Sequence, residues 1–110
     1  MLRNDQVCIR HILDASREAV GFADGRSRTD IDTDRQLNLS LVRLLEVIGE
    51  AARGISQDFR EAHPEVAWEK MIGMRHRLIH GYYDINLDVV WQTVTEDLPP
   101  LIAQMEKIEP

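Results

Sequence analysis

The chain has 110 residues, of which 44% are apolar, 5% aromatic and 29% charged. This length and balance predict one globular domain over residues 1–110 and exclude a disordered chain, a fibre and a membrane protein. The net charge of −6 at pH 7 argues against a protein that coats nucleic acid through its bulk charge.

Targeting signals and disulfides are not evident in the sequence. No stretch approaches the roughly 18 uncharged apolar residues that a membrane span needs. The N-terminus lacks the apolar segment of a signal peptide, so we expect a cytoplasmic protein. Cys8 is the single cysteine, which excludes an internal disulfide and a multi-cysteine metal site. We expect Cys8 to pack as a small apolar residue.

Apolar residues recur at helical spacing along nearly the whole chain, and no alternating strand pattern is present. The first predicted helix has Asn4 as its N-cap and ends near Gly25. The polar stretch 24–32 follows, and we predict that it is an exposed, mobile loop. Thr33 and Gln36 have the spacing of a capping box, which predicts a second helix whose apolar stripe runs over residues 37–55.

The second half of the chain predicts further helices. Ser56 can cap a short helical turn that ends before Pro64, because the residue before a proline avoids the helical region. A third long helix is predicted from about residue 66 to 80, with Gly81 at its end. Asn86 can cap a fourth helix. The two prolines Pro99 and Pro100 should kink or split this helix. We therefore predict an all-α bundle of four or five helices.

One segment, residues 74–84, concentrates reactive side chains. It holds two arginines, two histidines and both tyrosines of the chain, namely Arg75, His76, Arg77, His80, Tyr82 and Tyr83. Arginine can neutralise a phosphate, histidine can move protons near neutral pH, and a tyrosine ring can stack on a base. These capacities together suit the cleavage of a phosphodiester. No metal is required if arginine neutralises the phosphate, so we expect neither a metal nor a cofactor.

The spacing within this segment constrains the site. Arg75 and His80 are five residues apart, which places them about 140° apart around an unbroken helix. Either the helix ends before His80, or the site is assembled between two helices. A two-fold dimer would place both residues of both chains around one cleft. His76 and His80, in contrast, share one face.

Simpler interpretations exist for each of these residues. Arg75 and Arg77 can be solvated bases near a helix C-terminus, where the helix dipole favours them. His80 can be a helix-terminal residue with no catalytic role. His76 and His80 have the spacing of half a zinc site, but Arg77 stands where the metalloprotease motif needs a glutamate. Glu50 lies off the strongest part of the second apolar stripe, where it can be solvated, join a local ion pair or support Arg75.

The segment from Arg75 to Tyr82 resembles the R-x4-H-x-Y motif of HepT-like proteins in the HEPN superfamily. The resemblance extends to four further stretches: Leu44 to Ala52 in the second helix, His63 to Trp68 and Ile72 to Arg75 leading into the motif, and Val90 to Leu101 near the C-terminus. It covers nearly the whole chain. It implies a short all-α protein that forms a two-fold dimer, with the two motifs facing each other across the interface.

The resemblance also implies a function. Active members are metal-independent RNases that act as toxins and are neutralised by a nucleotidyltransferase antitoxin. By similarity, Arg75 would hold the scissile phosphate and His80 would act as general acid or base. His76 would position these groups or the RNA, with Arg77 and Glu50 in supporting roles. Tyr82 matches the tyrosine that receives AMP in related systems, although Tyr83 is its neighbour.

A second function class fits the acidic body of the chain. Some relatives in the superfamily serve as helical modules that bind a nucleotide or dock a partner without cleaving RNA. This chain could be such a module, paired with a nucleotidyltransferase. We favour the RNase, because the sequence contains every residue of the motif.

Overall fold

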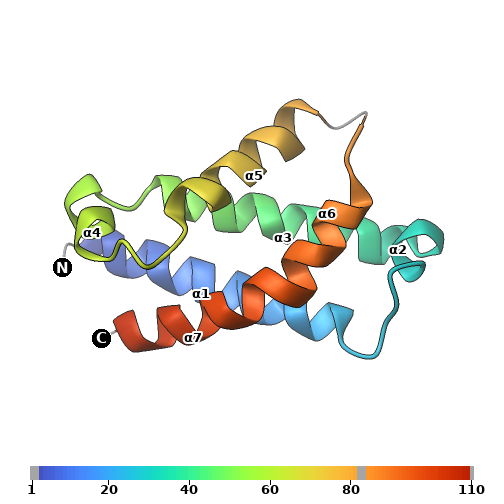
Figure 1. Ribbon diagram of the computed structural model, residues 1–110, viewed down its shortest axis with the longest axis horizontal. Helices are drawn as coiled ribbons and strands as arrows, with labels where there is room; N and C mark the ends of the chain where they lie inside the picture. Colours follow the sequence, from blue (N-terminus) through green and yellow to red (C-terminus); the bar gives the residue numbers. More distant parts are fainter. Residues whose placement is uncertain (1–2, 82–83, 110) are drawn as a thin grey trace.

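A computed structural model describes residues 3–81 and 84–109, with the side chains of Arg3 and His80 outside the description. Four helices of at least eleven residues form the bundle: α1 (Arg3–Ala23), α3 (Arg35–Arg53), α5 (Trp68–His80) and α7 (Leu98–Ile108). Three shorter helices join them: α2 (Asp30–Thr33), α4 (Gln57–Ala62) and α6 (Leu87–Gln92). Neither stretch of the described chain contains a strand, so the all-α prediction is confirmed (Figure 1).

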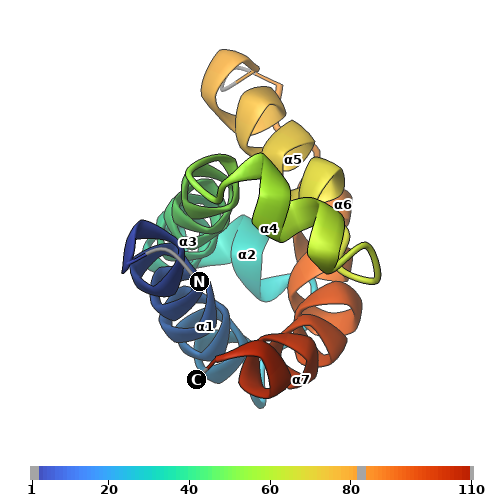
Figure 2. The same ribbon diagram turned by 90° about the vertical axis from the view of Figure 1, so that its left-hand side faces the viewer.

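The core lies where α1 packs against α3 and α7. Helix α5 packs on α3 and projects beyond the other helices when the bundle is viewed from its end (Figure 2). None of the described helices is both long and apolar enough to cross a membrane. Mainly aliphatic residues fill the interior, among them Ile9, Ile12, Leu13, Leu41, Leu45, Val90 and Val94, together with Trp68, Met74 and Met105.

Several predicted helix ends are confirmed. Each of them is formed by residues that are close together in the sequence. The Ser56 hydroxyl accepts a hydrogen bond from the Phe59 N–H and caps α4. The Asn86 side-chain oxygen accepts from the Asp88 and Val89 N–H groups and caps α6. Gly81 ends α5, and Gly25 follows α1 with a φ of +72°, a conformation that glycine adopts without strain.

Two predicted caps are wrong. Asn4 lies inside α1, and its side-chain amide donates to the Gly54 carbonyl across the bundle. Thr33 is the last residue of α2, and Asp34 caps α3 by accepting from the Leu37 N–H. Asp34 can do this because its backbone is extended, which turns the carboxylate back over the first turn of the helix.

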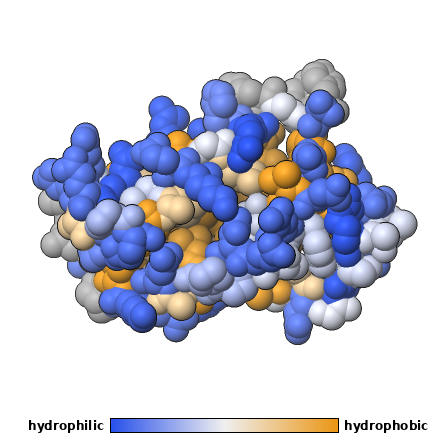
Figure 3. Space-filling view, in the orientation of Figure 1, coloured by the Kyte–Doolittle hydropathy of each residue, from blue (hydrophilic) through white to orange (hydrophobic). Residues whose placement is uncertain are grey.

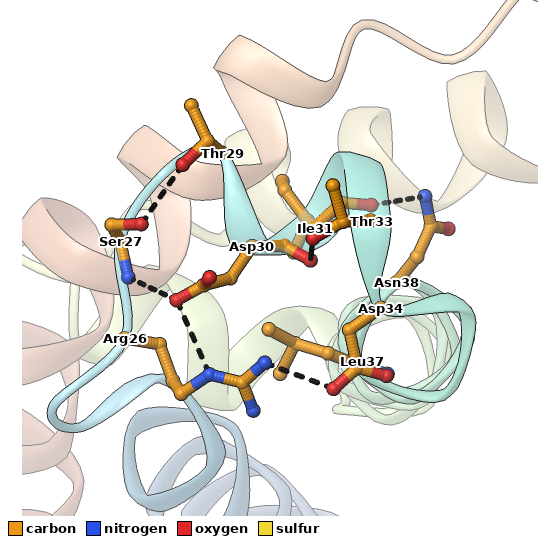
Figure 4. A network of polar contacts seen from close by, with 9 residues as sticks. All are labelled: Arg26, Ser27, Thr29, Asp30, Ile31, Thr33, Asp34, Leu37 and Asn38. Atoms are coloured by element: carbon orange, nitrogen blue, oxygen red, sulfur yellow. Dashed lines mark hydrogen bonds and ion pairs between the residues drawn. The ribbon is translucent and has the colours of Figure 1, made fainter.

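Side chains of the stretch 24–32 form a network of polar contacts, and the stretch includes the start of the short helix α2 (Figure 4). The Arg26 guanidinium bridges the carboxylates of Asp30 and Asp34, and the Ser27 N–H donates to Asp30. Helix α2 begins at Asp30 and buries Ile31, which is 1% exposed. The prediction of exposure is therefore wrong for Ile31, because this apolar side chain belongs to the core.

The predicted interruption near the prolines is confirmed, although it begins before them. A π-helical segment, η1 (Thr93–Asp97), separates α6 from α7. The Thr93 and Thr95 hydroxyls donate to carbonyls one turn back. Pro99 and Pro100 occupy the first turn of α7, where the missing proline N–H groups break the hydrogen-bond ladder least.

Cys8 packs against the core, as predicted from the sequence. Burial and, secondarily, the nearby Asp5 carboxylate raise the pKa of its thiol. The neutral thiol is therefore favoured, which agrees with a packing role.

Candidate active site

Helix α5 carries most of the predicted site residues and is held at both ends. At its start, the Trp68 indole N–H donates to the His63 carbonyl over 2.9 Å. At its end, the Gly81 N–H donates to the Arg77 carbonyl over 2.8 Å. A Cβ at Gly81 would lie 2.8 Å from that same carbonyl oxygen, so the close turn needs a glycine. These contacts fix the two ends of α5, the helix that carries Arg75, His76 and Arg77.

Arg75 faces α3. Its Nε lies 4.0 Å from the Glu50 Oε2, and its side chain is 23% exposed against 64% for Glu50. The buried Nε has no hydrogen-bond partner. No hydrogen bond joins the Arg75 side chain to any part of the chain that the structure describes. The structure thus brings Glu50 to Arg75, one of the alternatives that the sequence left open.

His76 and Arg77 lie on a different side of α5. Both are exposed, and both line an open pocket between the end of α5 and the start of α6. Asp84 and Asn86 line the same pocket, and buried residues such as Leu78 and Val90 form its apolar wall. Arg75 and Glu50 do not line it, so one copy of the chain does not gather all the predicted residues in one pocket.

The backbone resolves one of the alternatives for His80. Helix α5 runs through His80, so the possibility that the helix ends before this residue is wrong. The angular separation of Arg75 and His80 along one helix therefore stands. The side chain of His80 lies outside the described residues. Tyr82 and Tyr83, the candidates for modification, also lie outside them.

A second hollow lies between α5 and the C-terminal helices. Apolar side chains of α3, α5 and α7 line it, and Figure 3 shows hydrophobic patches between the mainly hydrophilic helix faces. The Lys70 ammonium and the Asp97 carboxylate, 2.9 Å apart, form an ion pair across its rim. This hollow contains no predicted catalytic residue. The described residues also hold no group of three or more His, Cys, Asp or Glu side chains placed for a metal ion.

The position of Gly49 was not predicted from the sequence. Gly49 lies in α3 directly against Arg75 and Met71 of α5. A glycine inside an apolar helical stripe was the only available signal, and such a glycine often marks close packing. The sequence alone could not indicate which helix approaches it.

Comparisons with known proteins identify the family of this chain. The family model described as "Ribonuclease HepT-like" matches residues 12–108. A protein of Thermococcus cleftensis named as a probable ribonuclease HepT is 42% identical over 79 residues, covering 72% of each chain. A candidate RNase of Caldanaerobacter subterraneus subsp. tengcongensis is 36% identical over 91% of this chain and 89% of its own.

A third relative, a candidate RNase of Methanocaldococcus jannaschii, is 33% identical over 94% of this chain and 95% of its own length. No solved structure gives a significant match. The family match spans most of the chain and includes the whole of α5. The chain therefore belongs to the HepT-like ribonuclease family.

Proposed function

We propose that this protein is an RNA endonuclease that cleaves without a metal ion at a site assembled from two copies of the chain. Membership in a ribonuclease family supports the reaction class. The observation that carries the proposal is the state of Arg75, whose guanidinium is held beside Glu50 yet makes no hydrogen bond within the described chain. Such a guanidinium can donate to the oxygens of a phosphate.

The proposed roles follow from the chemistry of the residues. Arg75 binds the scissile phosphate and stabilises the charge that develops on its oxygens during cleavage. His80 acts as general base or acid, taking the proton from the ribose 2′-hydroxyl as that oxygen attacks phosphorus, or giving a proton to the leaving 5′-oxygen. His76 and Arg77 hold the flanking part of the RNA.

A two-fold dimer accounts for the separation of these residues. Arg75 and His80 are five positions apart on one continuous helix, which separates these positions by about 140° around the helix axis. One α5 is therefore poorly suited to direct both residues at one phosphate. A second copy, related by a two-fold axis, would bring its own His80 toward the first copy's Arg75. Concentrating the arginines of two copies in one cleft would also offset the net charge of −6 per chain.

A cleavage assay in EDTA tests the enzyme. Wild type should cut transfer or messenger RNA, and Arg75→Ala and His80→Ala should each lose at least about a hundredfold in rate. All three proteins must have the same helical content and the same dimer fraction. Cleavage by His80→Ala at the wild-type rate would contradict its role. No cleavage by the wild type would favour the nucleotide-binding or partner-docking module.

We further propose that the protein is the toxin of a toxin–antitoxin pair and that a nucleotidyltransferase neutralises it at Tyr82. The tyrosine oxygen would attack the α-phosphorus of ATP, forming a phosphodiester to AMP and releasing pyrophosphate. The added phosphate would repel RNA beside the arginines. Incubation with the nucleotidyltransferase and ATP should add one adenylate to wild type and to Tyr83→Phe, but none to Tyr82→Phe. The reverse pattern would assign Tyr83.

A further inference from the structure

We propose that Gly49 is a positioning residue for Arg75. Because Gly49 has no side chain, α5 can pack closely against α3 at this point, and this close packing fixes where the Arg75 guanidinium lies. The inference rests on the proposed function for Arg75, and it concerns a residue with no chemistry of its own. The contact with α3 is the only extensive contact that α5 makes with a described helix.

The contact at Gly49 leaves no room for a side chain. A Cβ built there would lie 2.3 Å from the Arg75 Cβ, 2.6 Å from the Met71 carbonyl oxygen and 3.3 Å from the Arg75 Cα. Real Cβ atoms do not approach neighbours under 3.0 Å. Two of the three atoms belong to the α5 backbone, and the third is the first side-chain atom of Arg75. No flexible side chain can move aside, so α5 itself would have to shift.

The size of that shift is about 1 Å, because ordinary contact between such atoms begins near 3.4 Å. The shift would act first at Arg75, since this residue supplies the closest atom. Its guanidinium lies beside Glu50, the next residue of α3, and its Nε is buried in the seam between the helices. Separating the helices would expose the Nε and move the guanidinium. A misplacement of about 1 Å in a catalytic group can cost roughly a hundredfold in rate.

The chain contains a matched control on α5 itself. Gly73 is also a helical glycine, half-buried and two residues from Arg75, but a Cβ there would meet nothing within 4 Å. Replacing Gly73 with alanine adds the same methyl group and favours the helix. It leaves the contact between α3 and α5 unchanged.

The test compares Gly49→Ala and Gly73→Ala with wild type by two measurements. The first is the rate of RNA cleavage below the melting temperature of every variant, separated into kcat and KM. The second is the NMR signal of the Arg75 side-chain N–H, assigned through its loss in Arg75→Lys. We expect Gly49→Ala to lower kcat at least tenfold, with a much smaller change in KM. Its Arg75 N–H signal should shift and exchange faster with water.

Gly73→Ala should retain the wild-type kcat and the wild-type Arg75 signal. If Gly49→Ala is folded and also keeps both, Gly49 has no positioning role. If Gly49→Ala does not fold in buffer alone, it is compared with wild type by NMR in a stabilising osmolyte such as sucrose, and an unmoved Arg75 signal rejects the inference. Wild type that cleaves no RNA would overturn the proposed function, whereas the NMR comparison would still decide whether Gly49 seats Arg75.

Discussion

Asp5 and Ser56 are joined by two hydrogen bonds across the bundle. The Asp5 carboxylate accepts from the Ser56 N–H and from the Ser56 hydroxyl, each over 2.7 Å. Asp5 is 2% exposed, and Ser56 is the residue whose hydroxyl caps α4. A buried carboxylate near the start of α1 therefore holds the turn that connects α3 to α4.

Asp5→Asn should lower the free energy of unfolding by about 2 kcal/mol, because a hydrogen bond to a charged group contributes roughly 1.5–3 kcal/mol. The side-chain amide of this variant would also place an N–H donor opposite either the N–H or the hydroxyl of Ser56, both of which donate to Asp5 in the wild type. Urea unfolding at pH 7 measures the change. Asp24→Asn is the control, since Asp24 is exposed. Equal effects of the two substitutions would show that charge, rather than the contact with Ser56, is responsible.

Ser16 has a buried hydroxyl with no hydrogen-bond partner, and the residue is 0% exposed. Ser16→Ala should leave the protein equally stable or stabilise it by up to about 1 kcal/mol, because it removes an unsatisfied polar group and favours the helix. The reciprocal change, Ala19→Ser, adds a hydroxyl at another fully buried position of α1 and should destabilise it. The two melting temperatures test this pair. A marked loss of stability in Ser16→Ala would reveal a partner for the hydroxyl.

The contacts of Arg26 should make stability depend on acid pH. The Arg26 hydrogen bond lowers the pKa of Asp34, and the Ser27 N–H, followed by Arg26, lowers the pKa of Asp30. A carboxylate with a depressed folded-state pKa contributes stability above its unfolded pKa of about 4, and the contribution is lost as the pH falls through the folded value.

Arg26→Gln should therefore melt below wild type at pH 7, and the difference should shrink as the pH falls from about 5 to 2. The effect at neutral pH is small because the carboxylates are solvated, and salt should reduce it further. Arg43→Gln removes an exposed arginine that pairs with Glu46, outside this network, and is the control. A difference between wild type and Arg26→Gln that persists unchanged at pH 2 would contradict the assignment.

Glu50 should affect the activity more than the stability. Its carboxylate is 64% exposed and 4.0 Å from the Arg75 Nε, so the pair contributes at most about 1 kcal/mol to stability. Glu50→Gln should leave the melting temperature nearly unchanged and lower kcat for RNA cleavage several-fold, because Arg75 loses its charged neighbour. Glu46→Gln, one turn away on α3, is the matched control and should keep the wild-type kcat. An unchanged kcat in Glu50→Gln would limit Glu50 to a surface role.

The sequence by itself determined the long helices and several of their ends, but α2 was not predicted, since residues 24–32 were expected to form a loop. Ser56, Gly81 and Asn86 were predicted as caps because a cap is a contact between residues two to four apart, which a reader of the sequence can see. The apolar stripes predicted the core for the same reason, since helical spacing decides which residues share a face. The cap at Asp34 was missed because Thr33 offered an equally good local signal.

Only the tertiary structure decided how these helices meet. It placed Arg75 against Gly49 and Glu50, and it placed His76 and Arg77 around a pocket on another side of α5. It also buried Asp5 under Ser56, 51 residues away. Contacts between distant segments depend on the packing of whole helix faces, which periodicity along one segment does not specify. The reactive residues and their spacing around one helix could thus be found in the sequence, whereas the neighbours that each of them meets were decided by packing.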